Sequence, residues 1–378
     1  MSNKKILMAV ANYYTSPFQV GSHHFARAFA RLGYDVLFIS NPISPIHSFF
    51  ANNQDFKERE RIYKKHGENE SNIFYYVPKS IFTPQNKPFL SSKFVLNNWH
   101  KFTSPNLLNF IRKHNFSDVD ILWFDSPLFG FLLDEITYKR SILRIADYSK
   151  GFSSVSINQF QKETDIANRV DKVVYTAKNL KDKYSEILDK SKMLYVSNGL
   201  DADFFKNADR TFPDEFSDIP SPRVIYIGAI HEWFDDELIY YCAKKMPEHN
   251  FILIGSLNKD ISKLNNLKNV YILGPKPYSR ICQFLSNSDV GIIPFNVVRC
   301  PALVNSINPL KLYEYLACDL PVVSTRWEQI ENMKDYICMT QDKDIFLNFI
   351  KYPEKNSRFN IQKLSWLSKA KYILRKVY

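Results

Sequence analysis

The chain has 378 residues, of which 45% are hydrophobic and 15% aromatic, a composition that excludes an intrinsically disordered protein. The net charge is +11, and no run approaches the roughly 18 apolar residues that a membrane-spanning helix needs. The five cysteines lie far apart without a CxxC pair, which excludes a disulfide framework and a zinc ribbon.

The N-terminus begins with two lysines and only a short apolar run, so we expect a first strand rather than a signal peptide. A chain of this length favours two domains over one core. We therefore expect a two-domain, cytoplasmic protein.

The positive charge is concentrated in the first half. Residues 1–200 contain 27 Lys and Arg against 18 Asp and Glu, whereas residues 201–378 contain 23 against 21. This excess indicates an anionic partner, and the absence of a helix-turn-helix, zinc-finger or RNP-like motif argues against nucleic acid. Residues 87–114 interleave aromatic and basic side chains, which suits an anionic membrane surface. The alternative is an ordinary amphipathic segment packed on its own domain.

Strand and helix signals alternate along the first half. Residues 4–10, 23–33 and 34–40 predict a βαβ unit, and hence a parallel sheet. Further apolar runs that end in polar residues predict strands at 120–125, 141–147, 171–177 and 193–198. Open α/β sheets bind ligands at these carboxyl ends.

The second half repeats the pattern. We expect strands at 223–230, 250–256, 269–274, 289–295 and 322–325, and helices at 235–246, 278–288 and 310–317. The fold prediction is therefore α/β, with two Rossmann-like, doubly wound domains facing a cleft. We expect an N-terminal domain over 1–205, a C-terminal domain over 206–355, and a final helix in 356–378 that packs back on the first domain.

The segment Ser306–Thr325 is the most informative in the chain. Pro309 suits a helix start, and we expect Leu310, Tyr313 and Leu316/Ala317 to form the buried face. Lys311 and Glu314 are three residues apart and therefore neighbours on the helix. Such a pair could hold a phosphate and a sugar hydroxyl, or it could be a solvated ion pair.

Three segments resemble motifs of the GT-B glycosyltransferases, in the group that includes family 4 and family 70, the xanthan-type glucuronosyltransferases. They are NGLDADFF (198–205), YIGAIHEWFD (226–235) and NPLKLYEYLACDLPVVST (308–325). The resemblance implies transfer of a sugar from a nucleoside-diphosphate donor to a glycan or lipid-linked glycan acceptor held by the N-terminal domain. It implies a UDP-sugar, with UDP-glucuronate as one option, and a role in surface polysaccharide biosynthesis, such as capsule or lipopolysaccharide. The protein would then lie peripherally on the inner face of the plasma membrane.

The resemblance also suggests which residues bind the donor. Lys311, near a helix start, would contact the phosphates, and Glu314 would bind ribose or sugar hydroxyls. The loop from Gly228 would bring backbone N–H groups near the diphosphate. The predicted donor-binding residues are Gly228, His231, Glu232, Pro309, Lys311 and Glu314.

We expect no metal and no cofactor, because GT-B enzymes stabilise the leaving diphosphate with helix N-termini and basic side chains. Two DxD strings occur, Asp118–Asp120 and Asp201–Asp203, but one caps a strand and the other lies in the hinge.

Asp147 is the predicted catalytic base, because it matches the acid that ends the corresponding strand in the glucuronosyltransferase-like enzymes. The alternative is an Asp that only caps the next segment. Rival acceptor-side candidates are His23, His24 and Asp125.

Departures from the family pattern favour an inverting enzyme. Ser306 stands where retaining family 4 enzymes carry a second glutamate, and Asp319 replaces the glycine of the A-x-G-x-P motif. A glucuronate donor would need an additional cation, for which Arg299 is one candidate.

Two other classes remain open. A GT-B-fold sugar epimerase would need carboxylates on both sides of the sugar, a role that Glu232 and Asp147 could fill. A non-catalytic polysaccharide-assembly protein would have no affinity for nucleotides. An NAD(P) oxidoreductase is disfavoured, because no GxGxxG follows the first strand.

Overall fold

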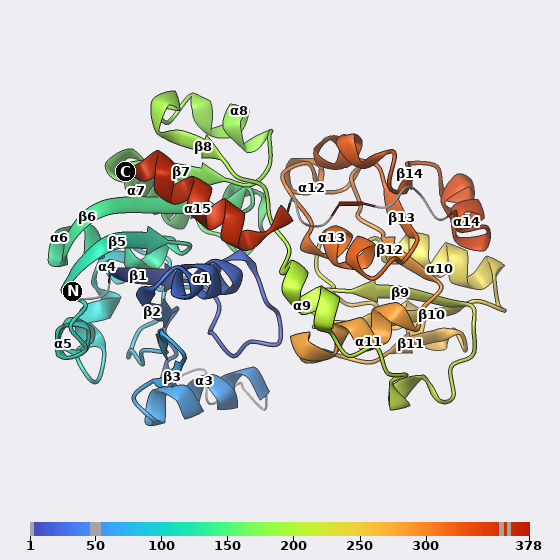
Figure 1. The fold of residues 1–378 in the computed structure, drawn as a ribbon, viewed down its shortest axis with the longest axis horizontal. Helices are drawn as coiled ribbons and strands as arrows, with labels where there is room; N and C mark the ends of the chain where they lie inside the picture. Colours follow the sequence, from blue (N-terminus) through green and yellow to red (C-terminus); the bar gives the residue numbers. More distant parts are fainter. Residues whose placement is uncertain (1–3, 46–53, 355–358, 361–363) are drawn as a thin grey trace. The chain divides into compact units, whose positions relative to one another are not determined.

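The structure, a computed structural model, describes residues 4–45, 54–354, 359–360 and 364–378. Contacts divide the chain into two compact units. Unit 1 comprises Met1–Ser197 and Trp366–Tyr378, and unit 2 comprises Asn198–Ser365. Each unit is an α/β structure built on its own sheet (Figure 1). Across the described residues, every helix is too short or too polar to cross a bilayer.

The boundary between the two units lies between residues 197 and 198, whereas we had expected the N-terminal domain to end at residue 205. The reason is that Leu200 and Phe205 are buried in the hydrophobic core of unit 2, which draws α9 (Ala202–Asn207) into that unit. The second expected boundary, at residue 355, lies outside the described residues.

Unit 1 contains an eight-stranded sheet in the order β3-β4-β2-β1-β5-β6-β7-β8. The neighbouring strands pair in parallel, apart from the edge strand β3, which pairs antiparallel with β4. The strands are β1 (Lys4–Val10), β2 (Tyr34–Ser40), β3 (Glu68–Glu70), β4 (Ile73–Tyr76), β5 (Asp118–Phe124), β6 (Thr137–Ile145), β7 (Lys172–Tyr175) and β8 (Met193–Tyr195). The strands expected in this half are thus confirmed, whereas β3 and β4 were not expected.

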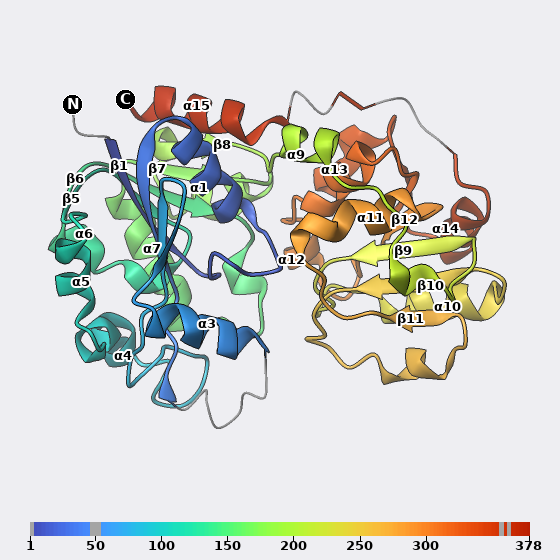
Figure 2. The same ribbon diagram turned by 60° about the horizontal axis from the view of Figure 1, so that its bottom comes forward.

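Helices flank this sheet, and the last of them comes from the C-terminal end of the chain. α15 packs along α1 (Figure 2). In this contact Trp366 stacks on His24, with ring centroids 5.1 Å apart. The helices are α1 (Gly21–Arg31), α3 (Gln54–Lys64), α4 (Lys93–Asn98), α5 (Leu107–Lys113), α6 (Leu132–Glu135), α7 (Ile157–Arg169), α8 (Leu180–Ser185) and α15 (Trp366–Val377).

The aromatic and basic segment 87–114 contains α4, a 3-10 turn (Trp99–Phe102) and α5. Trp99, Leu107 and Phe110 are buried in the core of unit 1, so part of its aromatic surface packs inside the unit. Phe89 and Phe94 remain 58% and 57% exposed.

Unit 2 contains a six-stranded parallel sheet in the order β11-β10-β9-β12-β13-β14. Its strands are β9 (Arg223–Ile227), β10 (Asn250–Ile254), β11 (Val270–Ile272), β12 (Val290–Ile293), β13 (Val322–Thr325) and β14 (Cys338–Thr340). Its helices are α9, α10 (Asp236–Lys245), α11 (Ile281–Ser286), α12 (Pro301–Val304), α13 (Leu310–Ala317) and α14 (Lys343–Lys351). The expected strands and helices are confirmed, and β14 and α14 are additional.

In each sheet the chain order reverses at one place. β1 lies between β2 and β5, and β9 lies between β10 and β12. The loops that leave the two strands at such a point run in opposite directions, which opens a crevice for ligands at the carboxyl ends. The residues that follow β9 and β12 are therefore the first place to look for a site in unit 2.

Candidate functional site

The loop after β9 begins with Gly228, which allows Lys311 to approach the sheet. Gly228 has a φ of +146°, and a Cβ atom there would lie 2.7 Å from Cε and 2.8 Å from Nζ of Lys311. Any larger residue would both strain the backbone and displace the lysine.

Lys311 lies against two aromatic side chains, one on β9 and one just after β12. Its Nζ donates a hydrogen bond to the hydroxyl of Tyr226 at 3.2 Å, and it lies 4.7 Å from the ring centroid of Tyr226 and 4.8 Å from that of Phe295. The Tyr226 hydroxyl in turn donates to the carbonyl oxygen of Ala229 at 2.8 Å. These contacts fix the ammonium group at the carboxyl ends of β9 and β12.

The same lysine belongs to the first turn of α13. Pro309 is the residue before the helix, with an extended backbone, and its side chain makes no hydrogen bond that caps the helix start. The first turn contains no acidic residue. The positive end of the helix dipole and the Lys311 ammonium therefore both create a positive potential here. This combination favours an anion at this position.

Glu314 is buried, so the interpretation of this residue as one half of a solvated ion pair is wrong. Burial raises the pKa of its carboxyl group to about 7, while a hydrogen bond with the Tyr278 side chain and the charge of Lys311 act in the opposite direction. A carboxyl group held in this way can bind hydroxyl groups of a ligand.

The buried face of α13 also differs from the expected one. Leu312–Tyr315 are buried, whereas Leu310, Leu316 and Ala317 are only half-buried. The helix packs against both α9 and β13, and the hydroxyl of Tyr315 accepts the backbone N–H of Ile227 at 2.8 Å. A helix covered on more than one side does not follow a single apolar stripe.

His231 and Glu232 lie in the loop after Gly228. The His231 ring stacks on Trp233 with a centroid distance of 4.7 Å, and its Nδ1 is 3.9 Å from Oε1 of Glu232. About a quarter of each side chain is exposed, so both can reach a ligand at this loop.

Two positions that depart from the family pattern are accommodated in the fold. Ser306 is buried, and its hydroxyl donates to the carbonyl oxygen of Leu303 at 2.7 Å. Asp319 has a φ of +54°, so the turn after α13 keeps the left-handed conformation that glycine adopts at lower cost.

In unit 1, Asp147 follows β6 at the carboxyl edge of the sheet and is half-buried. The loop around it is anchored on both sides. The hydroxyl of Thr176 donates to the carbonyl oxygen of Ala146, and the hydroxyl of Ser149 donates to Oε1 of Glu163 at 2.8 Å. Glu163 also accepts from the hydroxyl of Tyr184 at 2.5 Å, and burial raises the pKa of its carboxyl group.

Asp125 is paired inside the protein. Its Oδ1 lies 3.0 Å from Nη1 of Arg144, and its Oδ2 accepts from Nε1 of Trp123 at 2.7 Å. The Asp125 and Arg144 side chains are only 6% and 4% exposed. This geometry is that of a structural ion pair.

The two histidines at the start of α1 are also buried. Nε2 of His23 lies 3.0 Å from the carbonyl oxygen of Tyr13, and burial lowers the pKa of this imidazole to about 4. His24 stacks on Trp366 and lies 3.1 Å from Nη2 of Arg27, and burial holds its pKa well below the usual value. These contacts describe two neutral core histidines, whereas Asp147 is half-buried.

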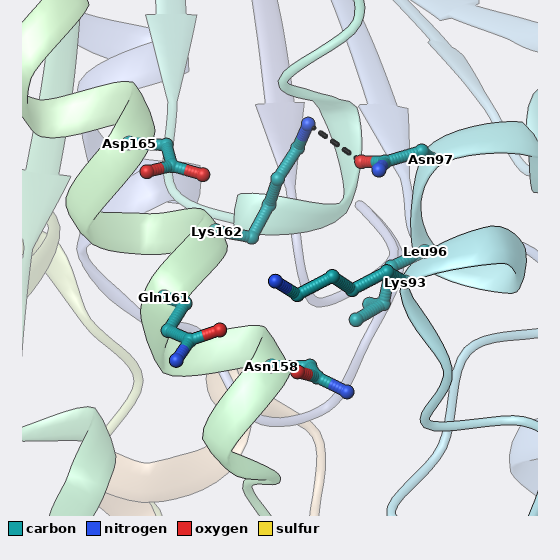
Figure 3. A pocket seen from close by; sticks show the side chains of 7 residues that line it. All are labelled: Lys93, Leu96, Asn97, Asn158, Gln161, Lys162 and Asp165. Carbon is teal, nitrogen blue, oxygen red and sulfur yellow. Dashed lines mark hydrogen bonds between the residues drawn. The ribbon is translucent and has the colours of Figure 1, made fainter.

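A groove of about 320 Å³ lies between α4 and α7 of unit 1 (Figure 3). Lys93 extends from α4 toward α7, and Nζ of Lys162 donates to Oδ1 of Asn97 at 2.8 Å. The sequence had not suggested this groove, whose residues are far apart in the chain. Its lining residues are Lys93, Leu96, Asn97, Asn158, Gln161, Lys162 and Asp165.

One aspartate of each DxD string makes contacts inside the protein. Asp120 accepts from the backbone N–H of Lys5 at 2.7 Å and from Nζ of Lys139, and Asp201 caps α9. In the described part of the chain, no three His, Cys, Asp or Glu residues gather as a metal site would require.

Several residues of the site in unit 2 were not predicted. Tyr226 and Phe295 lie in or beside apolar strands, where the sequence signals only burial, and Tyr278 comes from a separate 3-10 turn (Tyr278–Arg280). Only tertiary contact brings them to Lys311 and Glu314.

Comparisons with known proteins find a similar protein family for each half of the chain. Residues 8–176 match the family described as glucuronosyltransferase GumK, N-terminal domain, and residues 236–360 match the family described as glycosyl transferase-like. A putative teichuronic acid biosynthesis glycosyltransferase, TuaH of Bacillus subtilis (strain 168), is 27% identical over 254 residues. The alignment covers 62% of this chain and 62% of that relative.

Solved structures share the fold at low identity. Sucrose-phosphate synthase from Thermosynechococcus elongatus has a TM-score of 0.68 at 13% identity, with 98% of each chain covered. Anabaena HepE in complex with UDP and glucose has a TM-score of 0.59 at 14% identity, with 99% of this chain and 95% of that chain covered. WaaG, a glycosyltransferase of lipopolysaccharide biosynthesis, has a TM-score of 0.56 at 9% identity, over 98% and 95% of the two chains. Residues 8–176 are therefore similar to the N-terminal domain of GumK and residues 236–360 to a glycosyl transferase domain, and the chain has the GT-B fold of these solved structures.

Proposed function

We propose that this GT-B protein transfers a sugar from a UDP-sugar to a glycan or lipid-linked glycan acceptor in surface polysaccharide biosynthesis. The observation that carries the proposal is the uncapped start of α13, where the Lys311 ammonium and the helix dipole favour the same anion. The UDP and glucose named for HepE and the biosynthetic role named for TuaH support the choice of donor and pathway class.

On the donor side, we assign the diphosphate to Lys311 and to the backbone N–H groups at the start of α13. Gly228 leaves room for this lysine, and the loop through His231 and Glu232 would contribute further polar contacts. The Glu314 carboxyl group would bind hydroxyls of the ribose. When the bond from the anomeric carbon to the phosphate oxygen breaks, its electrons go to the leaving UDP, whose charge Lys311 and the helix stabilise.

On the acceptor side, we assign the general base to Asp147. An acceptor hydroxyl attacks the anomeric carbon while Asp147 takes its proton, which gives inversion in a single displacement. The hydrogen bonds of Ser149 and Thr176 hold the Asp147 loop in place. The groove of Lys93 and Lys162 in the same unit would suit an acceptor that carries an anionic group.

We also propose that unit 1 associates with an anionic membrane surface. Phe89 and Phe94 are exposed near Lys87 and Lys93 in the chain, and residues 1–200 carry the basic excess. Co-sedimentation with vesicles containing anionic lipid, weakened by Phe94→Ser, would test this part separately.

A donor screen with lipid-linked acceptors tests the function, and Asp147→Asn tests the mechanism. We expect the variant to bind UDP like the wild type while its transfer rate falls by about 10²–10⁴-fold, because general-base catalysis contributes roughly that factor. Asp182→Asn, an exposed aspartate on α8, is the matched control. Unchanged transfer by Asp147→Asn would reject the base, and a wild type without affinity for any nucleotide would reject the glycosyltransferase itself.

A further inference from the structure

Two hydrogen bonds join the helices on either side of the groove between α4 and α7 (Figure 3). Nζ of Lys162 on α7 donates to Oδ1 of Asn97 on α4 at 2.8 Å. Nδ2 of Asn158, one turn earlier on the same face of α7, donates to the carbonyl oxygen of Ser91 at 2.9 Å. The groove therefore has fixed walls, and its volume of about 320 Å³ is that of a small-molecule site.

Two ammonium groups enter this groove from opposite helices. Lys93 is exposed and points from α4 toward α7 (Figure 3). Lys162 is half-buried, and burial lowers the pKa of its ammonium group, although the charge of Asp165 acts in the opposite direction. Its hydrogen bond goes to a neutral amide oxygen, so among the described residues no carboxylate is bonded to this partly desolvated cation. A ligand with a negative charge would offset the desolvation.

The lining residues indicate how much negative charge the ligand carries. Lys93 and Lys162 bring two positive charges and Asp165 one negative charge, which leaves one positive charge in the groove. This balance suits a monoanion such as a carboxylate. A phosphate monoester carries nearly two negative charges, and Asp165 would repel it more strongly.

The other lining residues suit a sugar ring. Oδ1 of Asn97 is used by Lys162, but its amide nitrogen is a donor, and the amide of Gln161 offers both donors and an acceptor for hydroxyl groups. Leu96 adds an apolar wall against which the C–H groups of a ring can pack. A net positive charge beside amides and one apolar contact is what a carboxylated sugar requires.

The direction of α7 shows how a glycan reaches this groove. α7 connects the parallel strands β6 and β7, so it starts at the carboxyl edge of the sheet, where Asp147 lies, and runs back along the flank. The groove thus leads away from that edge, and a glycan whose end reaches Asp147 can place a more distant sugar in it. Resting on the proposed function, we propose that this groove binds a uronate unit within the acceptor glycan, with Lys93 and Lys162 on its carboxylate.

The test is a ligand-observed NMR titration of the full-length protein without any donor. Three probes are compared: a disaccharide with one glucuronate unit, the same disaccharide with glucose in its place, and glucose 6-phosphate. We expect the glucuronate disaccharide to bind about 10-fold more tightly than the neutral one, and Lys162→Gln or Lys93→Gln to remove that difference, because each loses a charge-assisted hydrogen bond. Lys113→Gln, an exposed lysine on α5, is the matched control and should change nothing.

Asp165→Asn tests the charge balance of the groove. Removing the aspartate charge should strengthen the binding of glucose 6-phosphate more than that of the glucuronate disaccharide, because a dianion is repelled more strongly. In transfer assays, Lys93→Gln should raise the KM of an acceptor that contains a uronate about 10-fold and leave the KM of a neutral acceptor unchanged. Lys93 is exposed, so this variant keeps the test valid if Lys162→Gln does not fold.

Several results would overturn the inference. Equal binding of the glucuronate and neutral disaccharides, or an equal loss in Lys162→Gln and Lys113→Gln, would reject the site. Tighter binding of glucose 6-phosphate would assign the groove to a phosphate group, and an equal rise in KM for both acceptors would separate it from the uronate. If the wild type bound the glucuronate disaccharide but no nucleotide, the proposed function would fail while the groove remained a uronate site.

Discussion

Arg144 in unit 1 and Lys311 in unit 2 are both cations at the carboxyl ends of parallel strands, yet their surroundings differ. Arg144 forms a 3.0 Å ion pair with Asp125, and both side chains are almost completely buried. Lys311 contacts the Tyr226 hydroxyl and the faces of two aromatic rings at the start of an uncapped helix. The first arrangement neutralises charge inside the protein, whereas the second places a cation at a helix start, where we propose that an anion binds.

The comparison teaches that position at a strand end does not by itself make a charged residue functional. Asp125 was a reasonable candidate from its place after an apolar run, but its carboxylate is occupied by Arg144 and Trp123. The partners of a charged group decide between a structural and a functional role.

The largest expected effect is on the stability of unit 1. Asp125→Asn leaves the Arg144 guanidinium buried without its carboxylate, so we expect a loss of about 3–5 kcal/mol in the free energy of unfolding, measured by urea denaturation. Asp134→Asn breaks the exposed pair with Arg169 and should cost less than about 1 kcal/mol. Equal losses in the two variants would show that the buried Asp125–Arg144 pair stabilises the protein no more than the exposed Asp134–Arg169 pair.

The next effect concerns nucleotide binding by unit 2. Lys311→Ala removes the ammonium from the start of α13, and we expect UDP affinity to fall about 100-fold in calorimetry, or about 2.7 kcal/mol. Lys343→Ala removes an exposed lysine that lies over the Tyr241 ring in the same unit and should leave UDP binding intact. Retained affinity in Lys311→Ala would place the phosphates elsewhere.

A smaller effect on UDP affinity tests whether Lys311 needs the space that Gly228 leaves open. A Cβ in Gly228→Ala would meet Lys311 at 2.7 Å, so we expect UDP affinity to fall about 10-fold because the lysine is displaced. Gly274→Ala adds a Cβ at another positive φ with nothing within 4 Å, so it introduces backbone strain alone. If both variants bind UDP equally well, the close approach of Gly228 to Lys311 has no functional role.

The last effect is a pH-dependent change in stability from Glu314. Its pKa is about 7 in the folded protein against an ordinary value of 4.5, so the folded state holds the proton more tightly and stability falls as pH rises from about 4.5 to above 7. Glu314→Gln removes this loss. We expect it to match the wild type at pH 5 and to melt about 3–6 °C higher at pH 8, in a thermal scan without ligand.

The control for this prediction is Glu328→Gln, an exposed acid in the same unit. Its melting temperature should follow the wild type at both values of pH. A gap between Glu314→Gln and the wild type that is the same at pH 5 and pH 8 would contradict an unusual pKa for Glu314.

Much of the fold follows from local patterns. The apolar run at Lys4–Val10 and the similar runs in the second half predict parallel strands, because only a sheet covered on both faces buries such continuous segments. The strand β3 escaped prediction because its three residues are polar, and β4 because its apolar run is only four residues long. The helix α7 has a capping box at Ser156 and Gln159, a signal that was present in the sequence and not used.

For the candidate site, the α13 segment could be predicted from the sequence alone, since Pro309, Lys311 and Glu314 are close in the chain and a helix start fixes their spacing. The burial of Glu314 and the contacts of Lys311 with Tyr226 and Phe295 became visible only in the folded structure. The physical reason is that burial and hydrogen-bond satisfaction depend on neighbours from distant strands and turns. Spacing along one helix determines which residues can act together, and packing determines whether their charges and hydrogen bonds are already used.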